Sequence, residues 1–364
     1  MTLVEGRVVT PYGVVDGHVE VDGPVILSVN AGRPGCDDWI VPGFVDLHVH
    51  GGGGHTFTTG NADAARGAAV FHLRHGTTTL LAGLVSSPYE LMREAVRAYA
   101  PLVAEGVIAG VHFEGPYLSA VRCGAQNPAY LRDPSPDEMR ALLAAGAPVR
   151  MVTLAPELPG ALEMIELLVG TGVVAAIGHT DATYEQTLAA VAAGASVGTH
   201  VFNGMRPPHH REPGPVFALL GTSPVVCELV ADGAHLHDGT LRFAAQVAGP
   251  ERTALITDAM DGAGMPDGTY RLGGQAVIVA DGVARLAHDS SIAGSRLTMD
   301  AALRRAVGAG IDLVDAVRMA STTPARVLGL ADDTGELAAG LRADLVVLAP
   351  DLRVKRVMRA GAWV

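Results

Sequence analysis

The 364-residue sequence has little positive charge, few cysteines and no long apolar run. Lys and Arg total 26 against 38 Asp and Glu, so the formal net charge is -12 at pH 7. Nucleic acid and anionic membrane surfaces repel a chain of this charge. No segment approaches the roughly 18 uncharged apolar residues that a membrane helix requires. We therefore expect a small-molecule ligand, with neither nucleic acid nor a membrane as a partner.

The three cysteines, Cys36, Cys123 and Cys227, are odd in number and widely spaced. This pattern excludes a disulfide framework and a cysteine-rich zinc site, and it favours a reducing compartment. The first ten residues lack the continuous apolar stretch of a secretory signal. The sequence therefore predicts a cytoplasmic protein, in which Cys123 is an ordinary loop residue rather than a metal ligand.

Short runs rich in Val, Ile and Leu alternate with Ala-rich segments of helical character from residue 40 to residue 331. This alternation is typical of parallel βα units, and two capping-box patterns, beginning at Ser135 and Thr183, mark helix starts. Eight runs qualify as barrel strands: Ile40–Val49, Thr77–Leu81, Gly106–Phe113, Val149–Leu154, Val173–Ile177, Ser196–His200, Pro224–Val230 and Arg252–Thr257. The sequence predicts one α/β domain, a TIM-type (β/α)8 barrel.

The two ends of the chain have a different pattern. Residues 3–29 and 344–364 contain short apolar runs that Gly, Pro and Asp interrupt, without helical segments between them. Their apolar side chains need burial. We expect both termini to form a small β-sandwich from residues 1–39 and 332–364, beside a hydrolase barrel at residues 40–331.

Six side chains with metal-binding or acid-base chemistry lie at or just after the ends of the expected strands. They are His48, His50, Glu114, His179, His200 and Asp258. Alternate side chains of a strand share a face, so His48 and His50 can converge on one ion. The carboxyl ends of barrel strands meet at one rim, where active sites form. The pattern predicts a metal-dependent hydrolase.

The ligand set does not choose among Zn, Fe, Co and Mn, although zinc is our first expectation. Six protein groups exceed what one catalytic ion with an open position takes, which favours two ions bridged by Glu114 over one. A single histidine or glutamate in this position is more often a core or surface residue. Six together change that interpretation, because unpaired buried charges cost several kcal/mol each.

Five segments resemble the successive motifs of the N-acetylglucosamine-6-phosphate deacetylases, a family of the amidohydrolase superfamily. They cover residues 42–51, 112–117, 178–180, 199–205 and 257–259. The resemblance implies hydrolysis of the acetamide of N-acetylglucosamine 6-phosphate. It also implies Glu114, His179 and His200 as ligands of the principal ion and Asp258 as the catalytic acid-base. His48 and His50 match a second metal pocket, which some family members have lost.

The resemblance further implies a set of substrate-binding residues. Arg211 and His235 would contact phosphate, for which the planar fork of arginine is suited. In this family one phosphate contact can come from the neighbouring subunit, so the resemblance implies a homodimer. The remaining substrate-binding positions are Ala125, Asn203, Gly204, Asp232, Ile292, Ala293 and Gly294.

One position departs from the family pattern. The segment Gly124–Pro128 has Gln126 where the family has a histidine that helps to polarise the scissile carbonyl. A glutamine amide donates only a neutral hydrogen bond, which is weaker than a charge-assisted bond. We expect Gln126 to bind substrate and to alter rate or substrate preference.

Two other classes of function stay open at this stage. The chain could deacylate another N-acyl amino sugar or an N-acyl amino acid, although Arg211 and His235 favour a phosphorylated substrate. It could also be a non-catalytic barrel that acts as a scaffold. The intact set of ionisable groups argues against a scaffold, since an unused buried cluster costs stability.

Overall fold

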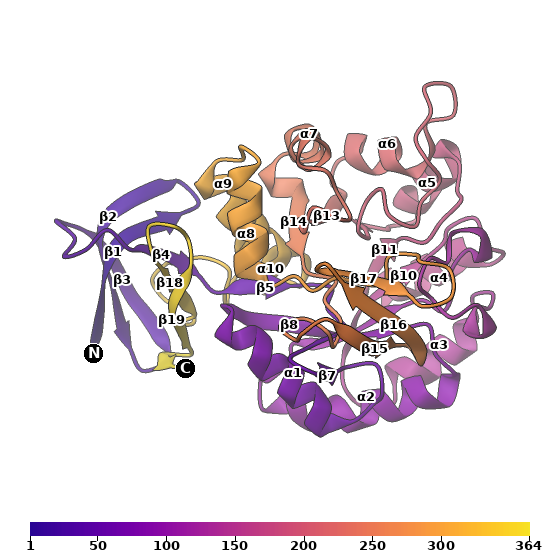
Figure 1. Ribbon diagram of the computed structural model, residues 1–364, viewed down its shortest axis with the longest axis horizontal. Helices are drawn as coiled ribbons and strands as arrows, with labels where there is room; N and C mark the ends of the chain where they lie inside the picture. The colour runs from indigo at the N-terminus through magenta and orange to yellow at the C-terminus, as the bar shows by residue number, and fades with distance from the viewer.

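A barrel surrounded by helices makes up most of the molecule, and a separate β unit that contains both termini lies at one end (Figure 1). The computed structural model describes all residues from 1 to 364. The expected fold class, a (β/α)8 barrel with a small β unit formed by both termini, is confirmed. All three cysteines are free. No helix has the length and apolar character needed to cross a membrane.

Eight parallel strands form the barrel, in the order β14-β13-β12-β11-β10-β9-β8-β5. They are β5 Phe44–Asp46, β8 Thr77–Val85, β9 Gly110–Glu114, β10 Val149–Leu154, β11 Val174–Ile177, β12 Val197–Gly198, β13 Val226–Val230 and β14 Thr253–Ile256. The segments after β14 and β5 complete the circle: the Asp258 amide donates to the His48 carbonyl at 2.8 Å, and the Thr257 hydroxyl donates to Asp46 at 2.5 Å.

Helices cover the outside of the barrel. They are α1 Ala62–Arg74, α2 Tyr89–Ala104, α3 Pro136–Leu143, α4 Ala161–Gly170, α5 Tyr184–Ala192, α6 Gly214–Gly221, α7 Asp238–Ala248, α8 Met299–Gly308, α9 Leu313–Val317 and α10 Thr323–Val327, with short helical turns at Ala120–Arg122, Pro128–Tyr130, Pro250–Arg252 and Arg318–Thr322. One apolar cluster of 76 buried residues joins strands and helices. This shared core holds the strand ends in fixed positions.

The capping signals agree with the helix starts in the structure. The Thr183 hydroxyl accepts from the Gln186 amide at 3.1 Å, and the Gln186 side chain accepts from the Thr183 amide at 2.9 Å. Ser135 accepts from the Glu138 amide at 3.4 Å, with Pro136 in the first turn. These bonds satisfy amides that a helix start leaves without partners.

The expected first barrel strand, Ile40–Val49, is wrong as a single element. The chain there forms two strands, β4 Trp39–Pro42 and β5, and they belong to different sheets. Gly43 lies between them, where a Cβ atom would come within 2.1 Å of the Thr78 hydroxyl. Apolar periodicity continues across this point because both strands are buried, so the pattern cannot detect the change of sheet.

The terminal sheet has seven strands in the order β20-β19-β18-β4-β1-β2-β3. The members other than β4 are β1 Thr2–Thr10, β2 Gly13–Asp22, β3 Val25–Ala31, β18 Leu345–Leu348, β19 Val354–Arg359 and β20 Ala362–Trp363. They enclose a separate cluster of 11 buried apolar residues that includes Ile26, Ile40 and Leu345. The division of the chain into two domains at residues 39/40 and 331/332 stays a prediction.

A third, smaller sheet follows β14 and was not expected from the sequence. Its strands are β15 Gly268–Leu272, β16 Gln275–Ala280 and β17 Val283–Leu286, and a two-stranded hairpin of β6 Gly51–Gly52 and β7 His55–Thr56 lies after β5. The three-stranded sheet packs through its own buried cluster on Val85 and Met260. Because Val85 ends β8, this sheet lies beside the rim formed by the barrel strand ends.

Candidate metal centre and substrate cavity

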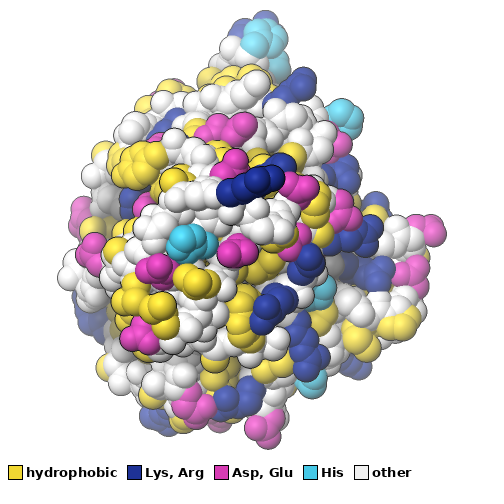
Figure 2. All heavy atoms as spheres, turned by 90° about the vertical axis from the view of Figure 1, so that its left-hand side faces the viewer, with side chains coloured by type: hydrophobic (Ala, Val, Ile, Leu, Met, Phe, Trp, Pro, Cys, Tyr) yellow, Lys and Arg dark blue, Asp and Glu magenta, His cyan; other side chains and the backbone are white.

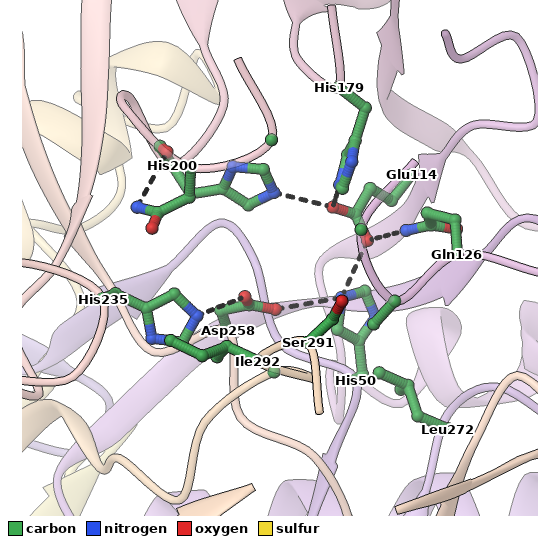
Figure 3. Close-up of a pocket in the computed structure, with 15 residues that line it drawn as sticks. His50, Glu114, Gln126, His179, His200, His235, Asp258, Leu272, Ser291 and Ile292 are labelled. Atoms are coloured by element: carbon green, nitrogen blue, oxygen red, sulfur yellow. Dashed lines mark hydrogen bonds and ion pairs between the residues drawn. The ribbon is translucent and has the colours of Figure 1, made fainter. Parts of the chain in front are cut away.

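The six predicted metal-site residues lie at the carboxyl ends of barrel strands and meet at one point; Figure 3 shows all of them except His48. His48 and His50 follow β5 and Glu114 ends β9, while the other three follow β11, β12 and β14. None of the six is more than 7% exposed. The barrel therefore gathers groups that are up to 210 positions apart in the sequence (from His48 to Asp258).

Glu114 lies at the centre of the cluster. Its Oε1 atom is 2.9 Å from Nε2 of His179 and 2.9 Å from Nε2 of His200. Its Oε2 atom is 3.2 Å from Nε2 of His50. Oε1 thus faces His179 and His200, with Nε2 of His48 at 3.6 Å, and Oε2 faces His50.

The second group lies at the base of the cluster. Nε2 of His48 is 3.1 Å from Nε2 of His50, and the latter atom is 3.2 Å from Oδ1 of Asp258. Zn–N distances of 2.0–2.1 Å place the ligand atoms of a tetrahedral ion about 3.3 Å apart. The 3.1 and 3.2 Å spacings of the second group match this value, and the 2.9 Å spacings around Oε1 of Glu114 are slightly shorter, so the residues fit a divalent metal ion. In two overlapping sets of three residues, the possible ligand atoms all lie within 4.8 Å of one another. One set is His48, His50 and Asp258, and the other is His48, Glu114 and His200.

The electrostatics of the cluster also suit a cation. Burial alone would raise the pKa of the Glu114 carboxyl, but the facing imidazoles of His48 and His179 hold that pKa well below its usual range. Burial opposes charge on His48, yet Glu114 raises the pKa of His48 well above its usual value. His112, packed against the His48 ring at 4.6 Å, has its pKa lowered well below the usual value by burial. The carboxylates thus create a negative site that attracts positive charge.

Hydrogen bonds from outside the cluster orient the imidazoles. Nδ1 of His50 donates to the Gly83 carbonyl at 3.1 Å, and Nδ1 of His179 donates to the Arg122 carbonyl at 2.9 Å. Nδ1 of His48 faces Oε2 of Glu228 at 3.2 Å. Such contacts leave each Nε2 lone pair free for a metal. Sequence reasoning missed Glu228, although a carboxylate inside the apolar run of β13 was a signal.

Three of the six residues have left-handed backbones. The φ angles are 46° at His179, 27° at His200 and 49° at Asp258. Non-glycine residues adopt this region at a cost of about 1–3 kcal/mol each, and such strain gathers at functional sites. At the end of a strand, the turn directs the side chain across the rim instead of along the strand.

A cavity of about 280 Å³ opens over the cluster. Among the predicted substrate-binding residues, its lining includes Ala125, Gln126, Asn203, Gly204, His235, Ile292 and Gly294. The prediction omitted three further lining residues: Gly124, Leu272 and Ser291. Leu272 belongs to β15, and sequence patterns gave no reason to place this sheet beside the rim.

Four predicted site residues lie outside the cavity lining. His48 is fully buried beneath it, and Ala293 is buried behind its wall. Asp232 orients His235 through a 2.7 Å contact between Oδ2 and Nδ1, and the other ring nitrogen of His235 is 3.8 Å from Oδ2 of Asp258. Arg211 is exposed on the loop before α6, and its guanidinium contacts only the His210 ring.

Gln126 uses both ends of its side-chain amide. The oxygen accepts from the Ser86 amide at 2.7 Å, and Nε2 donates to Oε2 of Glu114 at 2.6 Å. The first bond fixes which end of the amide faces the cluster. Gln126 therefore presents an N–H donor to the cavity and supports the central carboxylate.

The fold and this cluster define a metal-dependent hydrolase of the amidohydrolase type. Residues 39–364 match the model of the amidohydrolase family, and the chain belongs to this family.

The most informative relatives are amino-sugar-phosphate deacetylases. The N-acetylglucosamine-6-phosphate deacetylase of Lysinibacillus sphaericus is 36% identical over 90% of this chain and 86% of its own. The N-acetylgalactosamine-6-phosphate deacetylase of Escherichia coli O157:H7 is 37% identical over 96% of this chain and 93% of its own. A solved structure is similar to the whole chain: the N-acetyl-D-glucosamine-6-phosphate deacetylase of Mycobacterium smegmatis, as an aspartate-to-alanine variant in complex with N-acetyl-D-glucosamine 6-phosphate. It is 47% identical, its TM-score is 0.96, and the match covers 100% of this chain and 98% of the other.

Proposed function

We propose that the chain hydrolyses the acetamide of N-acetylglucosamine 6-phosphate to glucosamine 6-phosphate and acetate. The convergence of six ionisable side chains beneath one cavity carries this proposal, since the arrangement has no simple structural use. Relatives with this activity, at 36% and 47% identity over nearly the whole chain, support the choice of substrate.

The residues that would hold metal divide into two sets. Glu114, His179 and His200 form one, and His48, His50 and Asp258 form the other, with the two oxygens of Glu114 directed to different sets. We propose two divalent ions, zinc first, because the donors are mostly imidazole nitrogens. A divalent ion in this site lowers the pKa of water and polarises the amide carbonyl.

Asp258 is proposed to move the proton. Its carboxylate accepts a proton from the attacking water as the C–O bond forms, and it delivers that proton to the amide nitrogen as the C–N bond breaks. The amine leaves neutral, so an amine anion never has to form, and the second proton of the water is released from acetic acid to give acetate and, at neutral pH, a protonated amine. His50 at 3.2 Å and His235 at 3.8 Å keep the Asp258 carboxylate directed into the cavity.

The substrate is proposed to lie between the metal cluster and the loops of the rim. The Gln126 amide and Asn203 offer hydrogen bonds to the acetamide and the sugar, and His235 is a contact for the phosphate end. A phosphorylated sugar carries charge that prevents it from crossing a bilayer, which supports a cytoplasmic enzyme.

Metal dependence and acetate release test the proposal together. Protein stripped of metal should release no acetate from N-acetylglucosamine 6-phosphate, and zinc should restore release. Asp258→Asn should keep the ion proposed to lie between Glu114, His179 and His200, as measured by elemental analysis, while turnover falls about 10²–10⁴-fold. Asp332→Asn, at an exposed aspartate, is the matched control and should leave turnover unchanged.

Two results would overturn the proposal. One is near-normal turnover in Asp258→Asn. The other is a parent protein that binds metal yet releases no acetate from this substrate. Faster hydrolysis of unphosphorylated N-acetylglucosamine would reject the phosphate part of the proposal alone.

N-acetylgalactosamine 6-phosphate is a second candidate substrate. The N-acetylgalactosamine-6-phosphate deacetylase of Escherichia coli is 37% identical to this chain, and the N-acetylglucosamine-6-phosphate deacetylase of Lysinibacillus is 36% identical. The two substrates differ only at the C4 hydroxyl, and their kcat/KM values measured side by side decide between them.

We propose a homodimer in which Arg211 reaches the site of the partner subunit. The loop that carries it projects from the barrel, and Arg211 has no carboxylate partner within its own chain (Figure 1). Co-expression of Arg211→Ala chains with Asp258→Asn chains tests this arrangement. Shared sites predict recovery of roughly a quarter of the parental activity, because mixed dimers contain one intact site. Sites built within one subunit predict no recovery.

A further inference from the structure

A second cavity, of about 480 Å³, lies where the barrel meets the terminal sheet. Its walls are formed by three elements: the end of α1, the first half of α8, and β19. It is lined by Arg74, His75, Asp300, Arg304, Arg353, Val354, Lys355, Arg356, Val357 and Val364. It shares no lining residue with the cavity over the metal cluster, and we call it the basic pocket.

The charge of the basic pocket is opposite to that of the whole chain. Five of its ten lining residues are Arg or Lys, and Asp300 is its one acidic side chain. Asp351 and Asp38 pair with Arg353 and Lys355 from outside the lining, so even with a carboxylate on Val364 five cations face four anions, a balance of +1. The chain as a whole carries -12, and its single lysine, Lys355, lies here. On the end of the molecule that carries the terminal sheet, Lys and Arg gather in the right-hand half of the view in Figure 2.

Two of the five cations have no acidic partner. Arg74 and Arg356 form no ion pair, and the Arg356 guanidinium instead lies 3.6 Å from the centre of the Trp363 ring. Like charges held together without counter-charges repel each other, which makes a bound anion favourable. The stacked ring limits the positions of Arg356, so less conformational entropy is lost when it binds a ligand.

Arg304 is held in place at the base of the basic pocket. Its guanidinium donates to Asp300 at 2.7 Å and to the Leu352 carbonyl at 3.3 Å. Asp300 is buried, and it also accepts from the Thr298 hydroxyl at 2.6 Å and contacts Nδ1 of His75 at 3.2 Å. The base is therefore ordered, and the unpaired guanidinium groups lie around it.

We propose that the basic pocket binds a small phosphate monoester. Guanidinium groups match phosphate oxygens in pairs, and the number of arginines favours a dianion over a carboxylate. The pocket is concave and surrounded by an acidic protein, which suits a compact anion better than a long polyanion. This site is independent of the reaction proposed for the metal cluster.

Isothermal titration calorimetry of the metal-loaded protein with glucose 6-phosphate tests the proposal. The probe can also enter the cavity over the metals, so the decisive quantity is the difference in stoichiometry between variants. Arg74→Ser/Arg356→Ser should bind one equivalent fewer per chain than the parent, or bind it at least about tenfold more weakly. Both side chains are exposed, so the variant should keep its melting temperature and its KM for the substrate.

Arg97→Ser/Arg140→Ser is the matched control, since it removes the same charge from exposed positions outside the basic pocket. The control should keep the parental stoichiometry. Equal stoichiometry and affinity in the parent and the Arg74/Arg356 variant would overturn the proposal. An equal loss in the control would also overturn it, because the effect would then be one of net charge alone.

Discussion

The rim of the barrel and the terminal sheet both have buried clusters, but they bury different chemistry. At the rim, carboxylates and imidazoles lie within about 3 Å of one another, and three of their residues have left-handed backbones. The cluster within the terminal sheet is entirely apolar, and β1 and β2 pair over nine consecutive residues. The rim resembles a site built for a ligand, and the sheet resembles a structure built for stability.

The difference shows that the molecule loses folding stability mainly at the rim. Buried ionisable groups and strained backbone weaken a fold unless a ligand or a partner compensates for them. The terminal sheet carries a smaller cost, because its left-handed residues Leu352 and Ala360 lie in turns and its buried Asp344 is paired with Arg342. Its apolar cluster supplies burial at about 25 cal/mol per Å². Variants that separate stability from chemistry can test this division.

Leu345→Ala should lower stability most. Leu345 lies on β18, is fully buried, and packs in the terminal cluster with Ile26 and Ile40. Removing such a side chain leaves a cavity and costs about 2–5 kcal/mol. Chemical denaturation measures the loss, and the kcat of the folded fraction should not change. Leu27→Ala, at a half-exposed position of β3, is the control. A large fall in kcat would show that the sheet shapes the active site.

Acid should act first on the rim side of the molecule. Burial lowers the pKa of His72 to about 4, and its Nε2 lies 2.9 Å from the Gly51 carbonyl near the metal cluster. The unfolded chain binds this proton at pH 6.5 and the folded chain does not until about pH 4. Unfolding therefore takes up a proton within this window, and stability falls as the pH drops from 6.5 to 4.

Comparing the parent with His72→Gln isolates this contribution. Glutamine can keep a donor to the Gly51 carbonyl but does not titrate. The difference in unfolding free energy between the two proteins should change by about 1–3 kcal/mol between pH 6.5 and 4. His288→Gln, at an exposed histidine, should show no such change. A constant difference across the window would mean that His72 is charged in the folded protein.

Glu228→Gln should weaken the metal site without unfolding the protein. Glu228 is fully buried and faces both Nδ1 of His48 and the His200 amide. Loss of a carboxylate that orients a metal-binding imidazole typically costs 10–100-fold in metal affinity or activity. Competition with a chelator measures the affinity, and Glu185→Gln on the surface of α5 is the control. Unchanged affinity would reduce Glu228 to a packing residue.

Gln126→His should have the smallest effect, below about tenfold in kcat/KM. A histidine offers the cavity a stronger donor when it is charged, but it loses the paired bonds to Ser86 and Glu114. These effects oppose each other. Kinetics on both N-acetylhexosamine 6-phosphates measure the balance, and a change in preference between them would make position 126 a determinant of specificity.

Much of the fold and of the cluster could be predicted because periodicity and residue type reflect local physics. The run Val149–Leu154 is a strand over the predicted residues, and Thr183 caps a helix through the predicted pair of bonds. Leu272 and Ser291 were missed because their place at the cavity depends on a sheet that docks on Val85. No local pattern encodes such docking.

The sequence by itself determined the alternation of strands and helices, the position of the six ionisable residues at strand ends, and the apolar character of both termini. Only the tertiary structure decided that Glu114 directs one oxygen to each set of imidazoles, that β4 belongs to the terminal sheet, and that Arg74 and Arg356 line one pocket. The reason is physical. Periodicity reports which side of an element is buried, whereas the partner that buries it depends on contacts between residues far apart in the chain.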